Sequence, residues 1–305
     1  MTSFAAPAAP SVGRVLGDWH ADGLLLLVVA AAALYLLGVS RLAGHGRAWP
    51  RGRTVAFLSG LAVIAVATAS GLDDYGRVLF SLHVVQHVLL GMVAPLLLAL
   101  GAPVTLALQA LGRTNQRRLL RALRAPPVAV VAHPLTAWLL FGGALVVLYF
   151  TGLLEASLRH HWVHALVHVH FVAAGCLFLA RVVGVDPVPH ALGFGARVLY
   201  VLVALPFHAF LGVAILSSDR VLAGGWYEHV VRRWGTTALA DQRTGAGILW
   251  LAGELFGVVT TLVVVWRWMA ADERAAARHD RRLSLVPTSG PGRATTGPGA
   301  SEGTV

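Results

Sequence analysis

The chain has 305 residues, of which 57% are hydrophobic and 12% charged, and its mean hydropathy of +0.71 lies far outside the range of ordinary soluble domains. The net charge of +10 comes from arginine alone, and these arginines fall in loops and in the tail, so the basic face of a soluble nucleic-acid-binding module is missing. A single cysteine, Cys176, excludes an intramolecular disulfide framework and Cys-x-x-Cys motifs, and three methionines are too few for a methionine-rich metal site.

Seven apolar segments joined by short polar connections take up most of the chain. At a rise of about 1.5 Å per residue, about 20 helical residues cross a hydrocarbon layer about 30 Å thick, so each segment can span a membrane. The sequence therefore predicts an all-α polytopic membrane protein, a bundle of seven transmembrane helices. The predicted spans are residues 21–40, 54–72, 79–100, 135–154, 160–180, 198–218 and 244–266.

These spans divide the chain into three parts. We expect residues 1–20 to be an extracytoplasmic segment, 21–268 to form the membrane domain, and 269–305 to be a cytoplasmic tail that begins as a short helix and is partly disordered. The first span is interpreted as a retained helix and not a signal peptide, because four arginines follow it and only Arg14 precedes it. Gly101 and Pro103 end the third helix near Leu100, and the following turns are expected along the cytoplasmic interface.

The distribution of arginine predicts the orientation. The connections after the first, third and fifth spans, together with the tail, hold 17 of the 24 arginines. By the positive-inside rule these parts are cytoplasmic, which puts the N-terminus outside and the C-terminus inside.

Two pairs of histidines occur at helical spacing within the spans. His83 and His87 lie one turn apart in SLHVVQH, and His164 and His168 lie one turn apart in HHWVHALVHVH. Both helices start from the outer surface, so the two pairs are expected at the same depths of about 6 and 12 Å.

Two further polar groups are expected near this depth. His208 on the sixth span and Glu254 on the seventh each lie about 15 Å below the outer surface. Four helices therefore bring groups that can bind metal to the outer half of the membrane.

Such groups are expensive in lipid, at about 2.5–3.5 kcal/mol for a charged residue at a helix centre, and they face a partner, a cavity or an ion. An i,i+4 histidine pair is a natural bidentate ligand, and imidazole suits copper, zinc and iron. The predicted metal ligands are His83, His87, His164, His168, His208 and Glu254.

Simpler roles remain open for each of these residues. A lone histidine in a membrane helix often makes an interhelical hydrogen bond. Glu254 could accept a hydrogen bond from a ligand histidine and fix its tautomer, act as a proton-relay group, or be a neutral acid bonded to a neighbouring helix.

Other polar residues are candidates for supporting roles. His160 and His161 lie at the headgroup level and could capture an ion, whereas His133 belongs to the cytoplasmic side. Asp241 and Gln242, just before the seventh span, could cap a helix or form an extracellular gate.

Motifs of familiar enzymes are missing. The sequence has no HExxH, GxSxG or GxxxxGK[ST], and GFGAR at 193–197 is a lone GxG without a third glycine. We therefore expect a protein that is not an enzyme.

Four stretches of the sequence resemble the CtaG family of bacterial cytochrome c oxidase assembly proteins. They are SLHVVQHVLLGMVAPLLLALGAPVTLAL (81–108), HPLTAWLLF (133–141), HHWVHALVHVHFVAAGCLF (160–178) and ADQRTGAGILWLAGEL (240–255), and together they span the third to seventh helices. The resemblance implies a factor in the bacterial plasma membrane that helps build a haem-copper oxidase, with oxidase subunits and membrane lipid as partners. The matched residues to which it assigns importance are His83, His87, His133, His164, His168, Asp241 and Gln242.

The leading hypothesis is a copper-binding assembly factor without chemical turnover, which passes copper between imidazoles to the histidine-ligated copper centre of the oxidase. The first alternative is a b-type cytochrome or haem-handling protein, because histidines on facing helices also hold haem. The second is a transporter of metal ions or protons. A second copy of the chain could complete the site.

Overall fold

The structure, a computed structural model, describes residues 7–21 and 23–284, and no β-strand forms among them. Six helices are long and apolar enough to cross a membrane, and a pair bent by 76° brings the number to seven if it counts as one span. The predicted all-α multi-pass membrane bundle is confirmed. The spans are Gly23–Gly44 (α2), Arg51–Ala69 (α3), Phe80–Ala110, the bent pair Pro134–Phe150 (α10) and Leu153–Arg159 (α11), His161–Val183 (α12), Phe194–Leu216, and Ala238–Arg278 within α16 (Ala238–Ser284).

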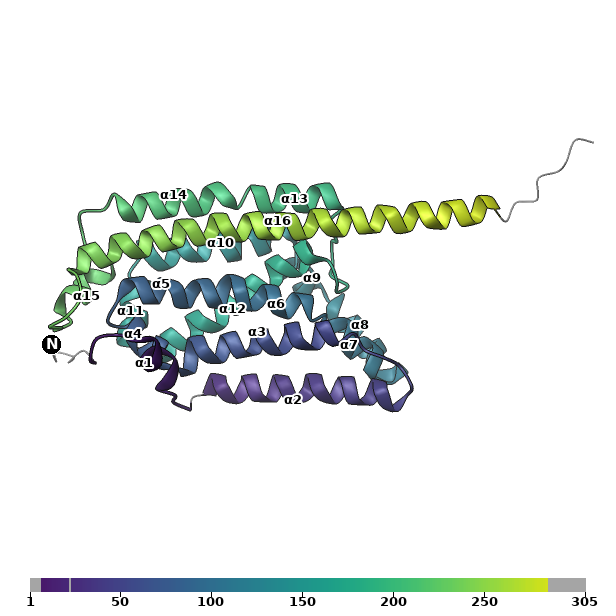
Figure 1. The fold of residues 1–305 in the computed structure, drawn as a ribbon, viewed down its shortest axis with the longest axis horizontal. Coiled ribbons are helices and arrows are strands. Elements are labelled where there is room, and N and C mark those ends of the chain that lie inside the picture. The colour runs from purple at the N-terminus through teal and green to yellow at the C-terminus, as the bar shows by residue number, and fades with distance from the viewer. Residues whose placement is uncertain (1–6, 22, 285–305) are drawn as a thin grey trace, which may run out of the picture. The chain divides into compact units, whose positions relative to one another are not determined.

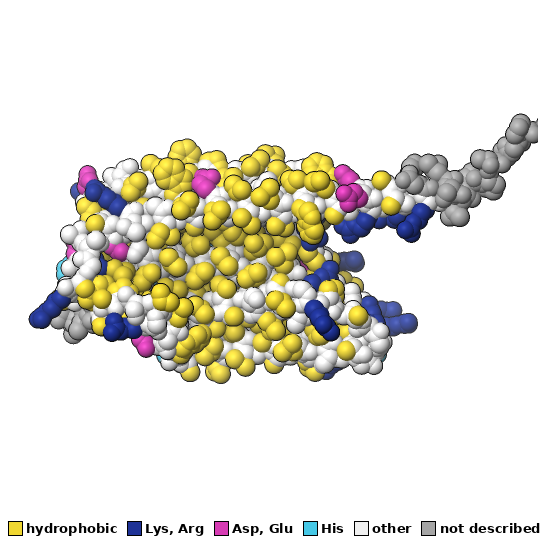
Figure 2. Space-filling model, in the orientation of Figure 1, with side chains coloured by type: hydrophobic (Ala, Val, Ile, Leu, Met, Phe, Trp, Pro, Cys, Tyr) yellow, Lys and Arg dark blue, Asp and Glu magenta, His cyan; other side chains and the backbone are white. Residues whose placement is uncertain are grey.

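Short helices lie at the two ends of the bundle, and Figure 1 shows them outside the long, roughly parallel helices. The α4 end contains α1 (Val12–Gly17), α4 (Gly71–Gly76), α11 and α15 (Trp226–His229); the α8 end contains α7 (Pro103–Ala110), α8 (Arg113–Leu123) and α9 (Pro126–Val131). On the face drawn in Figure 2, hydrophobic side chains form a broad band and the arginines gather outside it. An apolar band between two charged ends is typical of a membrane protein whose two ends face water.

The third span is interrupted by a π-helix. It runs as α5 (Phe80–Val88), the π-helix η1 (Leu89–Val93) and α6 (Ala94–Leu100), and it turns at Ala102, whose φ of 52° is left-handed, before α7 starts at Pro103. Gly175 of α12 packs so closely here that an added Cβ would clash with the Gly91 carbonyl. The π-helix begins two residues after His87 and contains Gly91, against which α12 packs, and such π-turns often mark functional sites.

A break separates α3 from α4. The Ser70 hydroxyl accepts the Leu72 backbone N–H and caps α4, so the chain turns where the apolar pattern predicts a continuous span to residue 72. Asp73 consequently lies in the first turn of a short helix at the α4 end.

Two other spans differ from the prediction. The fourth breaks at Thr151 and Gly152, and the sixth consists of α13 (Phe194–Leu202) and α14 (Leu205–Leu216). The bend leaves α11 at the α4 end of the bundle (Figure 1).

The chain forms two compact units, one up to Val265 and one from Trp266 onwards. α16 is unbroken to Ser284, where the sequence predicted a span that ends at residue 266 and a separate short helix, because no Gly or Pro interrupts residues 258–284. The predicted disordered end, residues 285–305, and the first six residues of the N-terminal segment lie outside the described residues.

Candidate metal centre

Four histidines from two helices meet near the α4 end of the bundle. We call them the histidine cluster: His83 and His87 of α5, and His164 and His168 of α12. Within each helix the ring centroids are 4.2 Å and 4.1 Å apart, and across the helices they are 5.9 Å (His83–His164) and 6.0 Å (His87–His168). The four rings therefore occupy the corners of one small quadrilateral.

The cluster is closed to solvent. The exposed fractions of the four histidines are between 0% and 3%, and Phe171 stacks on the His87 ring with centroids 4.5 Å apart. His87 Nδ1 lies 3.4 Å from the Tyr149 hydroxyl, its one hydrogen-bonding contact in the part of the chain that the structure describes. Since buried polar atoms are nearly always hydrogen-bonded, the remaining ring nitrogens need an explanation.

Five ring nitrogens of the cluster have no hydrogen-bond partner among the described residues. Both nitrogens of His83 are in this state, and so are Nε2 of His87, Nδ1 of His164 and Nε2 of His168. An unsatisfied buried polar atom costs about 1–3 kcal/mol, so histidines that served only for packing would be a poor choice here. Binding of an ion would use these lone pairs.

Asp73 joins the cluster from α4. Its Oδ1 accepts hydrogen bonds from His164 Nε2 at 3.0 Å and from the Gln86 side-chain amide at 2.8 Å. Burial of this carboxylate opposes its charge, but the hydrogen bond from His164 and the attraction of nearby histidines prevail and hold the pKa of Asp73 below its usual value.

A carboxylate that accepts a hydrogen bond from one imidazole nitrogen fixes the tautomer and the orientation of the ring, so that the other nitrogen is free to bind metal. Metal-binding histidines usually have such a partner. Potential ligand atoms of Asp73, His164 and His168 all lie within 4.8 Å of one another. Two nitrogens on one ion are at most about 4 Å apart, given bond lengths of about 2 Å, so side-chain movements of about 1 Å would close the site.

Sequence reasoning missed Asp73 because the predicted span ended one residue before it. The pattern Ser-x-x-Asp at 70–73 is the signal that could have found it, since it is typical of a helix N-terminus.

Polar contacts connect Asp73 with the surface at the α4 end. The Arg77 guanidinium lies 3.7 Å from Asp73 Oδ2 and donates a hydrogen bond to His161 Nδ1 at 3.2 Å. His160 and His161 are both exposed.

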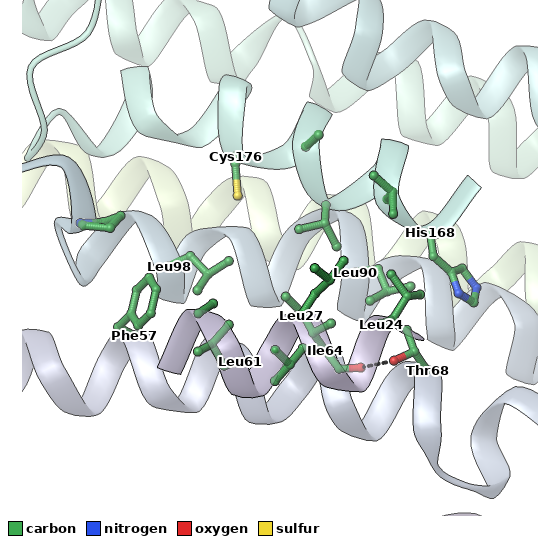
Figure 3. A pocket seen from close by; sticks show the side chains of 16 residues that line it. Leu24, Leu27, Phe57, Leu61, Ile64, Thr68, Leu90, Leu98, His168 and Cys176 are labelled. Carbon is green, nitrogen blue, oxygen red and sulfur yellow. Dashed lines mark hydrogen bonds between the residues drawn. The ribbon is translucent and has the colours of Figure 1, made fainter. Parts of the chain in front are cut away.

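On another side, His168 borders an apolar pocket of about 380 Å³ between α2, α3 and α12. Figure 3 shows His168 and Thr68 at one end of this pocket and Cys176 and Phe57 at the other.

The structure does not bring His208 into contact with the cluster. Its ring lies against Phe141 and Phe207, its Nδ1 donates to the Ala204 carbonyl at 3.0 Å, and Gly253 of α16 packs on its Cβ. Glu254, the next residue, is half-buried. The two predicted ligands therefore lie on the neighbouring helices α14 and α16.

Asp241 and Gln242 hold other segments in place. Asp241 accepts from the Ser81 hydroxyl at 2.6 Å and from the Ser81 backbone N–H at 3.3 Å, so it caps α5 from a different helix. Gln242 accepts from the Leu222 N–H and donates to the Arg220 carbonyl. Asp241 thus fixes the first turn of α5 two residues before His83.

His133 lies at the α8 end, where its Nδ1 accepts the Leu135 N–H and caps α10. Its exposed ring is 5.4 Å from that of His190, centroid to centroid.

A family model described as cytochrome c oxidase caa3 assembly factor matches residues 33–271. The chain belongs to this family. The match covers the histidine cluster and Asp73, and it confirms the resemblance seen in the sequence.

Uncharacterized proteins of Mycobacterium bovis and Mycobacterium tuberculosis are each 35% identical to this chain over 286 residues, and one of Mycobacterium leprae is 33% identical. These alignments cover 91% of the chain but 43% of each relative, so the chain spans less than half the length of the curated relatives it matches. No solved structure matches it.

Proposed function

We propose that the chain binds copper with the histidine cluster and supplies it during assembly of cytochrome c oxidase. The observation that carries this proposal is the set of five unpartnered ring nitrogens on four buried histidines in mutual contact. Family membership supports the assembly role, and the chemistry of the donors supports the metal, because imidazole without thiolate suits copper, zinc or iron.

The four histidines and Asp73 would have different roles in copper binding. His83, His87, His164 and His168 would supply the ligand nitrogens, and Asp73 would orient His164 through its hydrogen bond. The low-dielectric surroundings strengthen this carboxylate's attraction for a cation. Release would proceed by ligand exchange with another imidazole, which keeps the ion out of contact with lipid.

The arginine-rich α8 end would face the cytoplasm, and the α4 end with the cluster would face outwards. Copper would then arrive from the outer aqueous phase past His161, Arg77 and Asp73. No chemical turnover is part of this proposal.

The packing of the two helices favours a bare ion over haem. All four imidazoles are at most 3% exposed, and Gly175 of α12 packs against the Gly91 carbonyl one turn beyond His87, so a porphyrin would have to push the helices apart. A purified protein with a Soret band would contradict this choice, and copper flux into proteoliposomes would favour the transporter.

The test in cells uses the variant His83→Ala/His87→Ala. The matched control is His45→Ala/His229→Ala, which removes two exposed histidines. At equal amounts of membrane-inserted protein, we expect the oxidase purified from the cluster variant to lack copper and that from the control to contain it. Normal copper content in the oxidase of the cluster variant would refute the proposal.

A further inference from the structure

The α8 end carries a strongly basic helix that the metal site does not use. In α8 and its C-cap, Arg113, Arg117, Arg121 and Arg124 recur at spacings of four, four and three residues, which places them on one face. Arg118 lies beside this stripe. All five side chains are exposed, and we call them the arginine stripe.

The stripe has no negative partner within the described residues. None of the ion pairs there involves its five guanidinium groups, and the sequence has no acidic residue between Asp74 and Glu155. Asp186 is bound elsewhere, because it accepts hydrogen bonds from the Val104 and Thr105 backbone N–H groups and from the Thr105 hydroxyl. Five positive charges therefore lie together without compensation.

A second arginine-rich segment lies next to this end of the bundle. The loop between α2 and α3 contributes Arg47, whose guanidinium donates to the Gln109 side chain of α7 at 3.2 Å. Arg51 and Arg53 follow in the first turn of α3, and no acidic residue lies between them and Arg47. The basic surface therefore extends beyond α8.

Leu119 and Leu123, at i,i+4, form an apolar, half-buried face of α8 on the side away from the stripe, whereas the half-buried Leu120 lies among the arginines. α8 directly follows the membrane-length segment Phe80–Ala110 and precedes α9, whose Val130 is 63% exposed. A helix with leucines on one face and arginines on the other, held at the end of a membrane span, lies at the level of lipid headgroups.

We propose that the arginine stripe binds the phosphate groups of anionic phospholipids. Guanidinium groups pair with phosphate oxygens in a bidentate manner, and neighbouring arginines at i,i+4 can hold one diphosphate headgroup or two single ones. The membrane around the bundle supplies these headgroups at the level of α8. This inference is independent of the histidine cluster.

The test measures lipid binding to the full chain purified in a neutral detergent. Phosphatidylglycerol, cardiolipin or phosphatidylcholine is titrated in mixed micelles, and bound lipid is counted by native mass spectrometry. The variant is Arg117→Gln/Arg118→Gln/Arg121→Gln. The control, Arg220→Gln/Arg233→Gln/Arg243→Gln, removes the same charge from exposed arginines elsewhere.

We expect the wild type and the control to bind both anionic lipids in preference to phosphatidylcholine. The stripe variant should bind them about 100-fold more weakly, since each arginine at an anionic surface contributes about fivefold. Equal binding of phosphatidylcholine, or an equal loss in the control, would overturn the proposal. Complete displacement of the lipid by millimolar glycerol phosphate would also overturn it, because the site would then be one for soluble phosphate.

Discussion

Asp73→Asn is the substitution that probes the chemistry of the candidate metal centre most finely. The change keeps the size of the side chain and an oxygen that can accept from His164 Nε2 and Gln86, but it removes a negative charge that is 5% exposed. Loss of such a supporting carboxylate typically lowers metal affinity 10- to 100-fold, which corresponds to about 1.4–2.7 kcal/mol.

The control is Asp74→Asn, because Asp74 is the next residue in α4 and is exposed. Copper affinity is measured for both variants by competition with a chelator of known affinity, in the same detergent. We expect the Asp73 variant to bind at least 10-fold more weakly than wild type and the Asp74 variant to match wild type. Equal affinities for all three proteins would refute the role given to Asp73.

Three further substitutions test the architecture around the cluster. Asp241→Ala should lower the free energy of unfolding by about 1–3 kcal/mol, because it leaves the buried Ser81 hydroxyl and N–H without their partner. Ser81→Ala removes the hydroxyl and should therefore reduce the effect of Asp241→Ala in the double variant, as a thermal-shift assay would detect. Gly175→Ala should lower the free energy of unfolding by about 1–3 kcal/mol, because the added Cβ clashes with the Gly91 carbonyl. The control Gly247→Ala has open space around it and should be neutral or stabilise the protein by up to about 1 kcal/mol. Equal melting temperatures for these two variants would contradict the close packing of α12. His208→Asn should leave the copper content unchanged, and loss of copper would return His208 to the ligand set.

The fold class followed from the sequence because hydropathy over about 20 residues reports burial in lipid. The break at Ser70 could not be found in this way, since a cap of one hydroxyl group interrupts the helix without changing the apolar average. Asp73 was assigned to a loop for that reason. Similarly, the fourth span bends at Thr151 and Gly152, although its apolar character continues to residue 154.

The rise per residue yields an expected depth for each polar group, but it does not indicate the group's direction around the bundle. The two i,i+4 pairs have their rings in contact, whereas His208, expected near the same depth, contacts Phe141 and α16 instead. Depth depends on the rise per residue, but direction depends on how helices pack, which a single sequence does not reveal.

Asp241 illustrates a contact that no local pattern contains. It was expected as a cap of its own helix, yet α16 begins three residues earlier and the carboxylate caps α5, 160 residues away in the sequence.

The most direct test of the central claim is the copper content of the full chain, purified after growth with copper and measured by elemental analysis. The wild type and the His45→Ala/His229→Ala control should carry about one copper ion per chain, and the His83→Ala/His87→Ala variant should carry almost none. A wild type without copper, or a cluster variant that retains as much as the wild type, would contradict the assignment of these imidazoles as its ligands.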